Sequence, residues 1–377
     1  MHGGDIYRNN VKYDFSVNVN PLGMPEEMKN AILAAMDHLD EYPDPEAEML
    51  RNRIAARIGV PAECIIPGNG ASEIFMAAVH ALEPSDVLLA APSFSGYEYS
   101  VKSVGKSRIR YFMLEEERDF SLEESGIAAG ESLNPADHEE QSPAQSRKTD
   151  YLNALEELGK TQKPMAFLAC PNNPNGRLVS PDYLCEILKT CEKNGIRMIL
   201  DECFLDFSEN VFAYRKMLAE ENCPHLIRVG AYTKICAIPG VRLGYAVVQD
   251  KELRDLIHRQ LPEWNLSAFA QAAGSAEYDE CEWMRKTWEH LKAERSFLLS
   301  VFAEPSIAAN IKVYPSDANY MLLKTEIPLY SRMLERGILI RDCSDYPGLS
   351  KGYYRIAVKS RQENEALASA LREICGG

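Results

Sequence analysis

The sequence predicts an α/β fold, with a large domain built on a mainly parallel sheet and a smaller α+β domain after it. Short Val/Ile/Leu-rich runs alternate with helical stretches between residues 87 and 202, as in parallel sheets covered by helices on both faces. Beyond residue 250, helical stretches dominate, with three strand-like segments among them. We therefore expect an N-terminal arm at 1–45 that joins the small domain, a large domain at 46–260 and a C-terminal small domain at 261–377.

Composition limits the class of protein. With 377 residues, 46% hydrophobic and 26% charged, the chain is typical of globular proteins with one large or two ordinary domains. A formal net charge of −15 argues against nucleic acid or an anionic membrane as partner, because both bind basic surfaces. The sequence has no stretch of 18 apolar residues and no signal-peptide pattern. The ten cysteines are scattered without zinc-like spacing, which predicts reduced thiols, a cytoplasmic location and no metal site.

The first elements are an extended arm and two helices. The arm ends in Asp14-Phe-Ser-Val-Asn-Val-Asn-Pro-Leu-Gly23, which predicts an extended segment and a turn. A helix is expected over 25–38, opened by Pro25, with an apolar face formed by Met28, Ile32, Leu33 and Met36. A second helix over 46–58 ends at Gly59, a typical C-cap.

A glycine-rich turn, Pro67-Gly-Asn-Gly70, lies between a short apolar strand and a helix that continues through Leu82. Backbone N–H groups at the start of such a helix can bind an anion, and small residues let the ligand approach closely. Most glycine-rich turns only connect elements, so this turn alone leaves both interpretations open.

Four apolar runs, at 87–94, 109–114, 165–171 and 197–202, are the expected strands of the parallel sheet. Ligands of such sheets bind beyond the carboxyl ends of the strands. Phe94, Asn173 and Asp201 all fall at such ends, on different strands.

The rest of the chain divides into a polar insertion and the small domain. Residues 129–150 are polar and lack an apolar period, which predicts a surface loop or a disordered segment, and we assign them no function. A long amphipathic helix is expected over 283–302, and strands within 312–323, 337–342 and 353–358.

The stretch 228–247 contains Thr233-Lys234, a Pro239-Gly240 break and Arg242. A lysine between a strand and a turn, beside a hydroxyl and a fixed cation, suits a site that holds a phosphate and forms a Schiff base. Burial and cationic neighbours lower the pKa of such an amine and make it nucleophilic. From these residues alone, an exposed lysine in a loop is an equal alternative.

Taken together, Pro171-Asn-Asn-Pro-Asn-Gly176, Leu200-Asp-Glu-Cys-Phe204, Lys234 and Arg242 resemble the fold-type I pyridoxal-phosphate enzymes, the aspartate aminotransferase superfamily. The resemblance covers nearly the whole chain. It implies the seven-stranded, mainly parallel sheet of that fold type, pyridoxal 5'-phosphate as cofactor and a homodimer with shared active sites.

The resemblance also implies roles around the cofactor ring. Lys234 would bind the cofactor aldehyde, Asp201 would keep the pyridine nitrogen protonated, and Asn173 would contact the ring hydroxyl and the substrate. Phe94 would stack on the ring, with Tyr97 as the second choice.

Further roles concern the cofactor phosphate. The residues expected to hold it are Gly70, Ala71, Ser72, Thr233 and Arg242, together with Tyr42 from the partner subunit. Four of the residues given roles here and above also have an ordinary interpretation: Asp201 as a helix cap, Arg242 as a surface cation, Asn173 as a turn residue and Phe94 as core.

Within the superfamily, the chain resembles the histidinol-phosphate aminotransferase branch, which also contains the threonine-phosphate decarboxylases of cobalamin synthesis. The segments Tyr42-Pro-Asp-Pro45, Ala237-Ile-Pro-Gly-Val-Arg-Leu-Gly-Tyr245 and Leu339-Ile-Arg-Asp-Cys-Ser-Asp-Tyr-Pro-Gly348 are similar to the decarboxylases. Phe204 is a further similarity, since the decarboxylases have phenylalanine at this position whereas the aminotransferases usually have tyrosine.

The resemblance therefore implies decarboxylation of an amino acid phosphate, with L-threonine O-3-phosphate as the expected substrate and histidinol-phosphate transamination as the alternative. Arg355 would bind the substrate carboxylate, while Arg341, assisted by His2, would bind the phosphate. Either arginine taken alone could be a surface salt bridge. The two reactions differ in substrate orientation, which the sequence does not reveal. A cofactor-free binding protein on the same scaffold is a third possibility, which the intact residue set argues against.

Overall fold

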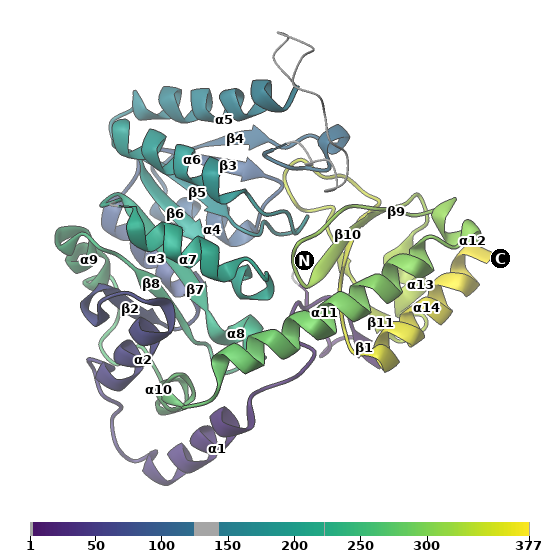
Figure 1. The fold of residues 1–377 in the computed structure, drawn as a ribbon, viewed down its shortest axis with the longest axis horizontal. Coiled ribbons are helices and arrows are strands. Elements are labelled where there is room, and N and C mark those ends of the chain that lie inside the picture. Colours follow the sequence, from purple (N-terminus) through teal and green to yellow (C-terminus); the bar gives the residue numbers. More distant parts are fainter. Residues whose placement is uncertain (1–2, 124–142, 222, 377) are drawn as a thin grey trace.

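The computed structural model describes residues 3–123, 143–221 and 223–376, which form two lobes (Figure 1). The larger lobe contains a seven-stranded sheet in which β8 alone runs opposite to the other six strands. In spatial order the strands are β2 (Ile65–Gly68), β8 (Gly244–Val247), β7 (Leu226–Ala231), β6 (Arg197–Asp201), β5 (Pro164–Ala169), β3 (Asp86–Ala91) and β4 (Arg108–Met113). The predicted α/β class and mainly parallel sheet are confirmed.

Helices cover both faces of this sheet (Figure 1). One face packs on α3 (Ala71–Leu82), α4 (Ser95–Val104) and α9 (Lys251–His258), and the other on α5 (Pro143–Gly159), α6 (Pro181–Lys193) and α7 (Val211–Glu220). All six residues of β5 are therefore buried, with Phe167 in one core and Leu168 in the other. This explains why the strands read as continuous apolar runs instead of alternating ones.

The smaller lobe is built on a four-stranded antiparallel sheet. Its strands are β12 (Arg341–Asp342), β13 (Tyr353–Ala357), β10 (Tyr320–Lys324) and β9 (Lys312–Val313), and its helices are α11 (Glu280–Phe302), α12 (Pro305–Ala308), α13 (Leu329–Leu334) and α14 (Arg361–Gly376). The arm joins this lobe because β1 (Tyr13–Asp14) pairs in parallel with β11 (Ile338–Leu339). The expected long helix and the three strand segments are confirmed.

Three further helices, α1 (Glu26–Ala34), α2 (Glu48–Ile58) and α10 (Ala268–Ser275), pack together beside the large sheet. Gly59 caps α2 in the left-handed region (φ 73°), as expected. The first helix differs from its prediction: Pro25 precedes it, and it continues as a 3₁₀-helix over Ala35–His38. Of its predicted apolar face, only Met28 is buried. Leu33 and Met36 are more than half exposed. The domain boundaries expected at 45/46 and 260/261 remain a prediction.

The end of the predicted polar insertion is helical. Residues 143–150 belong to α5, which contradicts a loop or disordered segment there, while 129–142 lie outside the described residues. The helix is anchored further along, where Tyr151, Leu155 and Leu158 are fully buried at helical spacing against the sheet. A buried apolar stripe of this kind stabilises a helix whose neighbouring turns are polar.

A carboxylate joins the two lobes. Glu116 follows β4 of the large sheet and accepts hydrogen bonds from the hydroxyls of Tyr314 (2.7 Å) and Tyr353 (2.6 Å) and from Lys324 Nζ (2.7 and 2.9 Å), all in the smaller lobe. Burial opposes ionisation of this carboxyl, but the hydrogen bonds of Lys324 and the tyrosines outweigh it and lower the pKa of Glu116 to about 2. The ionised carboxylate therefore stabilises the contact between the lobes.

Replacing this charge should destabilise the protein at neutral pH. We expect Glu116→Gln to lower the free energy of unfolding by about 1–3 kcal/mol at pH 7, the usual cost of disrupting hydrogen bonds to a charged group. The pKa of Glu116 is lower in the folded than in the unfolded chain, so this stabilisation is present above the ordinary carboxyl pKa of 4.5 and is lost as the pH falls towards about 2. The urea midpoints of both proteins measure the difference across this range.

Glu335→Gln is the matched control, because Glu335 is exposed and lies 4.0 Å from Arg336. This change should stay within about 0.5 kcal/mol of the unmodified protein. Equal midpoints for Glu116→Gln and Glu335→Gln at pH 7 would show that the Glu116 contacts add nothing to stability.

Candidate active site

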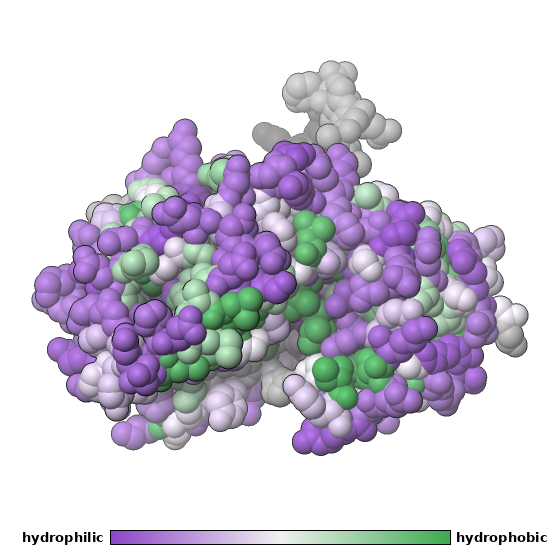
Figure 2. Space-filling model, turned by 90° about the horizontal axis from the view of Figure 1, so that it is seen from below, coloured by the Kyte–Doolittle hydropathy of each residue, from purple (hydrophilic) through white to green (hydrophobic). Residues whose placement is uncertain are grey.

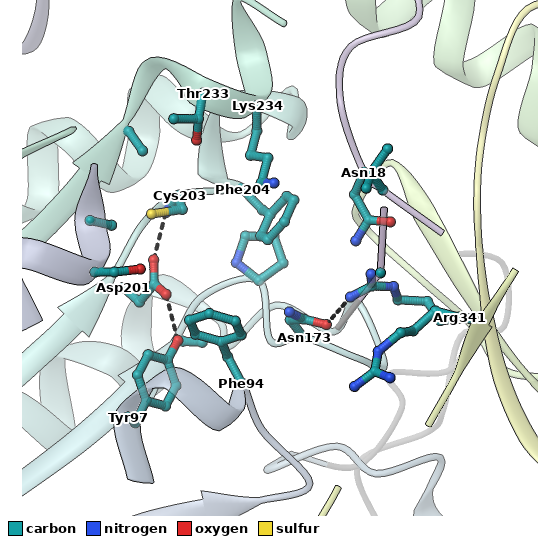
Figure 3. Close-up of a pocket in the computed structure, with 18 of the residues that line it drawn as sticks. Asn18, Phe94, Tyr97, Asn173, Asp201, Cys203, Phe204, Thr233, Lys234 and Arg341 are labelled. Atoms are coloured by element: carbon teal, nitrogen blue, oxygen red, sulfur yellow. Dashed lines mark hydrogen bonds between the residues drawn. The ribbon is translucent and has the colours of Figure 1, made fainter. Parts of the chain in front are cut away.

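A cavity of about 260 Å³ lies where the carboxyl edge of the large sheet meets the smaller lobe. The large lobe contributes Ala71, Ser72, Phe94, Tyr97, Asn173, Asp201, Cys203, Phe204, Thr233, Lys234 and Arg242. The smaller lobe adds Arg341, Tyr346 and Arg355, and the arm adds Gly3, Ser16, Val17 and Asn18. In Figure 3, Asp201 and Arg341 lie on opposite sides of this cavity with Lys234 between them. The structure thus brings together most of the residues singled out in the sequence.

Lys234 is placed by a short helix, α8 (Tyr232–Ile235), that begins directly after β7. The lysine lies between a strand and the turn at Pro239-Gly240, as expected, within one helical turn whose carbonyls are held from the arm. Asn20 donates from its backbone N to Lys234 O (2.9 Å) and from its side chain to Ile235 O (2.9 Å). Burial in the cavity wall, and after it the nearby Arg355 and Arg242 cations, lower the pKa of Lys234 to about 8. The amine is therefore a stronger nucleophile at neutral pH than an ordinary lysine.

Asp201 ends β6 and is almost fully buried. Its carboxylate accepts hydrogen bonds from the Tyr97 hydroxyl and from Cys203 N (2.9 Å), both drawn as dashed lines in Figure 3. Burial raises the pKa of Asp201, and these two hydrogen bonds offset only part of the increase. A cationic N–H group placed against this carboxylate would favour its ionised form. Tyr97 supports Asp201 through its hydroxyl, and its ring stacks on Phe167 (5.0 Å between ring centroids).

The start of α3 forms an anion cradle with Arg242. Gly70 precedes the helix with φ 80°, and a Cβ there would lie 2.5 Å from Arg242 Nη2, so only glycine lets the guanidinium approach. The N–H groups of Ala71 and Ser72 belong to the first helical turn, where the helix supplies no acceptor. Arg242 is held by a hydrogen bond from Nη1 to Pro239 O (3.2 Å). Together with the Thr233 hydroxyl, these groups can bind a phosphate.

Arg355, on β13, is buried among neutral oxygens. It donates to the side-chain oxygen of Asn173 and to Ser16 O (2.9 Å). With its amide oxygen turned towards Arg355, Asn18 accepts from Nε (3.2 Å) and Nη1 (3.1 Å). None of these three partners neutralises the guanidinium, so Arg355 gives the cavity a positive charge suited to a carboxylate.

Arg341, on β12, has a different partner. It is 5% exposed, and its Nη2 donates to both carboxylate oxygens of Asp345, at 2.7 and 3.0 Å. Its guanidinium also lies over the ring of Tyr346, 5.2 Å from the centroid. The second buried arginine of the cavity is thus paired with a carboxylate four residues further along the chain.

Three predicted residues are not among those lining the cavity. Gly70 lies just behind it as the residue before α3. Tyr42 is 81% exposed and packs on Trp264 (5.0 Å between centroids) instead of on the cavity. His2 lies outside the described residues.

Sequence reasoning predicted the arm but missed its contribution to the cavity, as well as the supporting residues. Ser16, Asn18 and Asn20 are polar and at most 2% exposed, and their alternate spacing directs them to one side of the extended arm. Asparagines at every second position of a short extended segment were the available signal. No comparable pattern marks Tyr346, whose hydroxyl lies 3.5 Å from the side-chain oxygen of Asn173.

Comparison with known proteins gives the family. The sequence matches the class I and II aminotransferase family over residues 10–371. A threonine-phosphate decarboxylase of Salmonella typhimurium is 33% identical over 367 residues, which cover 97% of this chain and 91% of that protein. A histidinol-phosphate aminotransferase of Clostridium kluyveri is 28% identical, covering 97% and 94% of the two chains.

A solved structure of a similar protein has the same fold over nearly the whole chain. The histidinol-phosphate aminotransferase of Clostridium acetobutylicum has a TM-score of 0.80 and 25% identity, and covers 97% of this chain and 99% of its own. The sequence match, the relatives and this fold agree over nearly the whole length. The chain therefore belongs to the class I and II aminotransferase family, a family of fold-type I pyridoxal-phosphate enzymes.

Proposed function

We propose that the protein is a pyridoxal-phosphate-dependent decarboxylase of an amino acid phosphate. The substrate would be L-threonine O-3-phosphate, and the products (R)-1-amino-2-propanol O-2-phosphate and CO2. The observation that carries this proposal is the 33% identity with the Salmonella typhimurium enzyme, which extends over both lobes. Two buried arginines, paired on the neighbouring strands β12 and β13 and lining the same cavity as Lys234, also suit a substrate with a carboxylate, an amine and a phosphate.

The residues of the cavity fit the cofactor. Bound pyridoxal phosphate supplies an electron sink for the pair of electrons left at the substrate Cα when a bond to it breaks. Lys234 would bind the cofactor aldehyde, Phe94 would pack on the ring, and Asp201 would face the ring nitrogen. The cradle formed by the start of α3 and Arg242 would hold the cofactor phosphate.

The substrate groups would be divided between the two arginines. Arg355, with its neutral partners, would bind the carboxylate, and Arg341 would bind the phosphate. This placement would orient the Cα–carboxylate bond for cleavage, so that CO2 leaves and Lys234 returns a proton to Cα. The same residues could remove the Cα hydrogen if the substrate were turned. Histidinol-phosphate transamination is therefore the second candidate, favoured by the TM-score of 0.80 with the Clostridium acetobutylicum enzyme.

The decisive experiment supplies cofactor-loaded protein with O-phospho-L-threonine and no keto acid, and follows CO2 and the phosphorus NMR spectrum. We expect steady CO2 release and a new aminopropanol phosphate signal, because decarboxylation needs no amino acceptor. Absence of CO2, together with keto product formed from histidinol phosphate when a keto acid is present, would establish the aminotransferase instead.

Lys234→Ala should lower the rate of the reaction by at least about 10²–10⁴-fold, the usual contribution of a positioned proton-transfer group.

Nucleophilic capture of the cofactor should follow the protonation of Lys234. In cofactor-free protein, we expect the rate of capture to rise about tenfold per pH unit up to a pH of about 8 and to level off above it, since only the neutral amine reacts. Stopped-flow absorbance after mixing with pyridoxal phosphate measures this rate. Arg355→Gln removes a nearby cation and should move the midpoint upwards. A rate that keeps rising towards pH 10.5, the ordinary lysine pKa, would contradict the assignment.

We also propose that the protein is a homodimer and works in the cytoplasm. Leu33, Met36, Leu39, Tyr42 and Met49 are all more than half exposed. They belong to α1, the segment after it and the start of α2, and α1 lies at the bottom of Figure 1. Figure 2 views the molecule from that side and shows apolar side chains gathered on it. A second copy would cover this surface and could bring Tyr42 to the cofactor phosphate.

No helix in the described part of the chain is long and apolar enough to cross a membrane.

Loss of Tyr42 should weaken cofactor binding across the dimer. We expect Tyr42→Ala to raise the dissociation constant for pyridoxal phosphate by about 10- to 100-fold, the effect of a hydrogen bond to a charged group. Mass photometry establishes the oligomeric state, and absorbance titration of cofactor-free protein gives the constant. Tyr7→Ala, at a tyrosine that is 90% exposed, is the control. A monomer, or unchanged binding by Tyr42→Ala, would rule out the shared site.

A further inference from the structure

The helical turn that carries Lys234 is too short to hold itself in place. The helix α8 has only four residues, and a helix leaves its last four carbonyls without partners inside the helix. Two of these carbonyls are met just beyond its end, where Tyr232 O accepts from Cys236 N (3.0 Å) and Lys234 O accepts from Ala237 N (3.2 Å). The position of the Lys234 backbone therefore depends largely on contacts from other parts of the chain.

Asn20 supplies such contacts from the arm. Its backbone N donates to Lys234 O (2.9 Å), and its side-chain Nδ2 donates to Ile235 O (2.9 Å). The same Ile235 carbonyl accepts from Trp283 Nε1 (3.1 Å) at the start of α11. Two residues remote in sequence thus hold the end of the turn that bears the lysine.

Asn20 is itself fixed by its surroundings. It is 2% exposed, its Oδ1 accepts from Leu22 N (3.0 Å), and its Nδ2 also donates to Thr287 Oγ1 (2.8 Å), which is fully buried on α11. Both ends of the amide are therefore engaged. The side chain joins the arm, α8 and α11 at one buried point.

We propose that Asn20 is a positioning residue for Lys234, which holds the amine within reach of the cofactor aldehyde through the carbonyls of α8. This inference rests on the proposed role of Lys234 in binding that aldehyde. The lysine amine lies at the end of a flexible four-carbon stem, so its reach depends on where the backbone is held. A displacement of about 1 Å at a reacting group can cost about 10² in rate.

A double-mutant cycle tests whether Asn20 acts through Lys234. Dissociation constants for pyridoxal phosphate are measured by equilibrium dialysis on the unmodified protein, Asn20→Ala, Lys234→Ala and the double variant. We expect Asn20→Ala to raise the constant by about three- to tenfold, the effect of one lost hydrogen bond. In the Lys234→Ala background the same change should alter it by less than about twofold, because no amine remains to be placed.

The pH dependence of cofactor capture gives a second readout. The charged or ionisable groups near the amine are Arg355, Arg242, Asp201 and Cys203. Asn20→Ala changes none of these charges, so a moved midpoint reports a changed position of the amine. We expect the midpoint to rise above about 8, because burial is the main cause of the lowered pKa of Lys234.

Trp283→Phe is a second variant for the case in which Asn20→Ala folds poorly. It keeps an aromatic ring but removes the other donor to Ile235 O. Both the dissociation constant and the midpoint should move in the same direction as in Asn20→Ala, by a smaller amount.

Asn364→Ala is the matched control. Asn364 is also fully buried, and its side chain donates to Glu294 (2.9 Å) and to Lys359 O (2.9 Å) in the smaller lobe. These three residues are not among those lining the cavity. The control should lower the urea midpoint and leave the dissociation constant and the pH midpoint unchanged.

Other results would overturn the proposal. If Asn20 only stabilised the fold, Asn20→Ala would behave like Asn364→Ala. An equal loss of affinity in the Lys234 and Lys234→Ala backgrounds would likewise show that Asn20 does not act through the lysine. Failure of the proposed role of Lys234 looks different, because Lys234→Ala would then bind the cofactor as tightly as the unmodified protein. All these readouts concern cofactor binding, so they do not depend on whether O-phospho-L-threonine releases CO2.

Discussion

The site depends on holding several cations together around one cavity between the lobes. Lys234, Arg242 and Arg355 repel one another, and the cost is limited because one of them can give up its proton. Neutral oxygens around Arg355 satisfy its N–H groups without removing its charge. A chain with a formal net charge of −15 thus contains a local positive field that can attract small anions.

The large sheet and the smaller lobe contribute different residues to this cavity. Parallel strands bring Asp201 and Lys234 to one edge, because β6 and β7 both end there. The arginines expected to contact the substrate come from β12 and β13 of the other lobe, so their distance from the lysine depends on how the lobes meet. Glu116 helps to fix that geometry from outside the cavity, through Tyr353, which lies two residues before Arg355 on β13.

Much of the fold could be predicted, because buried parallel strands leave apolar runs that are visible in the sequence. Asn173, Asp201 and Lys234 could be placed together for the same reason, since such strands end at a common edge. The pairing of Arg341 with Asp345 could not be predicted, because either side chain could have faced solvent. Nor could the hydrogen bond from Tyr97 to Asp201, which joins residues 104 positions apart and depends on how α4 packs on the sheet. Helix α5 was partly missed because its stabilising contacts lie in its later turns.

The arm gives the chain a particular order of assembly. Ser16 meets Arg355 across 339 positions, and β1 pairs with β11, so the arm contacts residues that are made long after it. The large sheet uses strands that end by Val247 and can form while the ribosome is still adding the rest. The substrate side of the cavity cannot be complete until β13 has been made. Until then the arm lacks these partners, so the large sheet precedes the complete site in the order of synthesis.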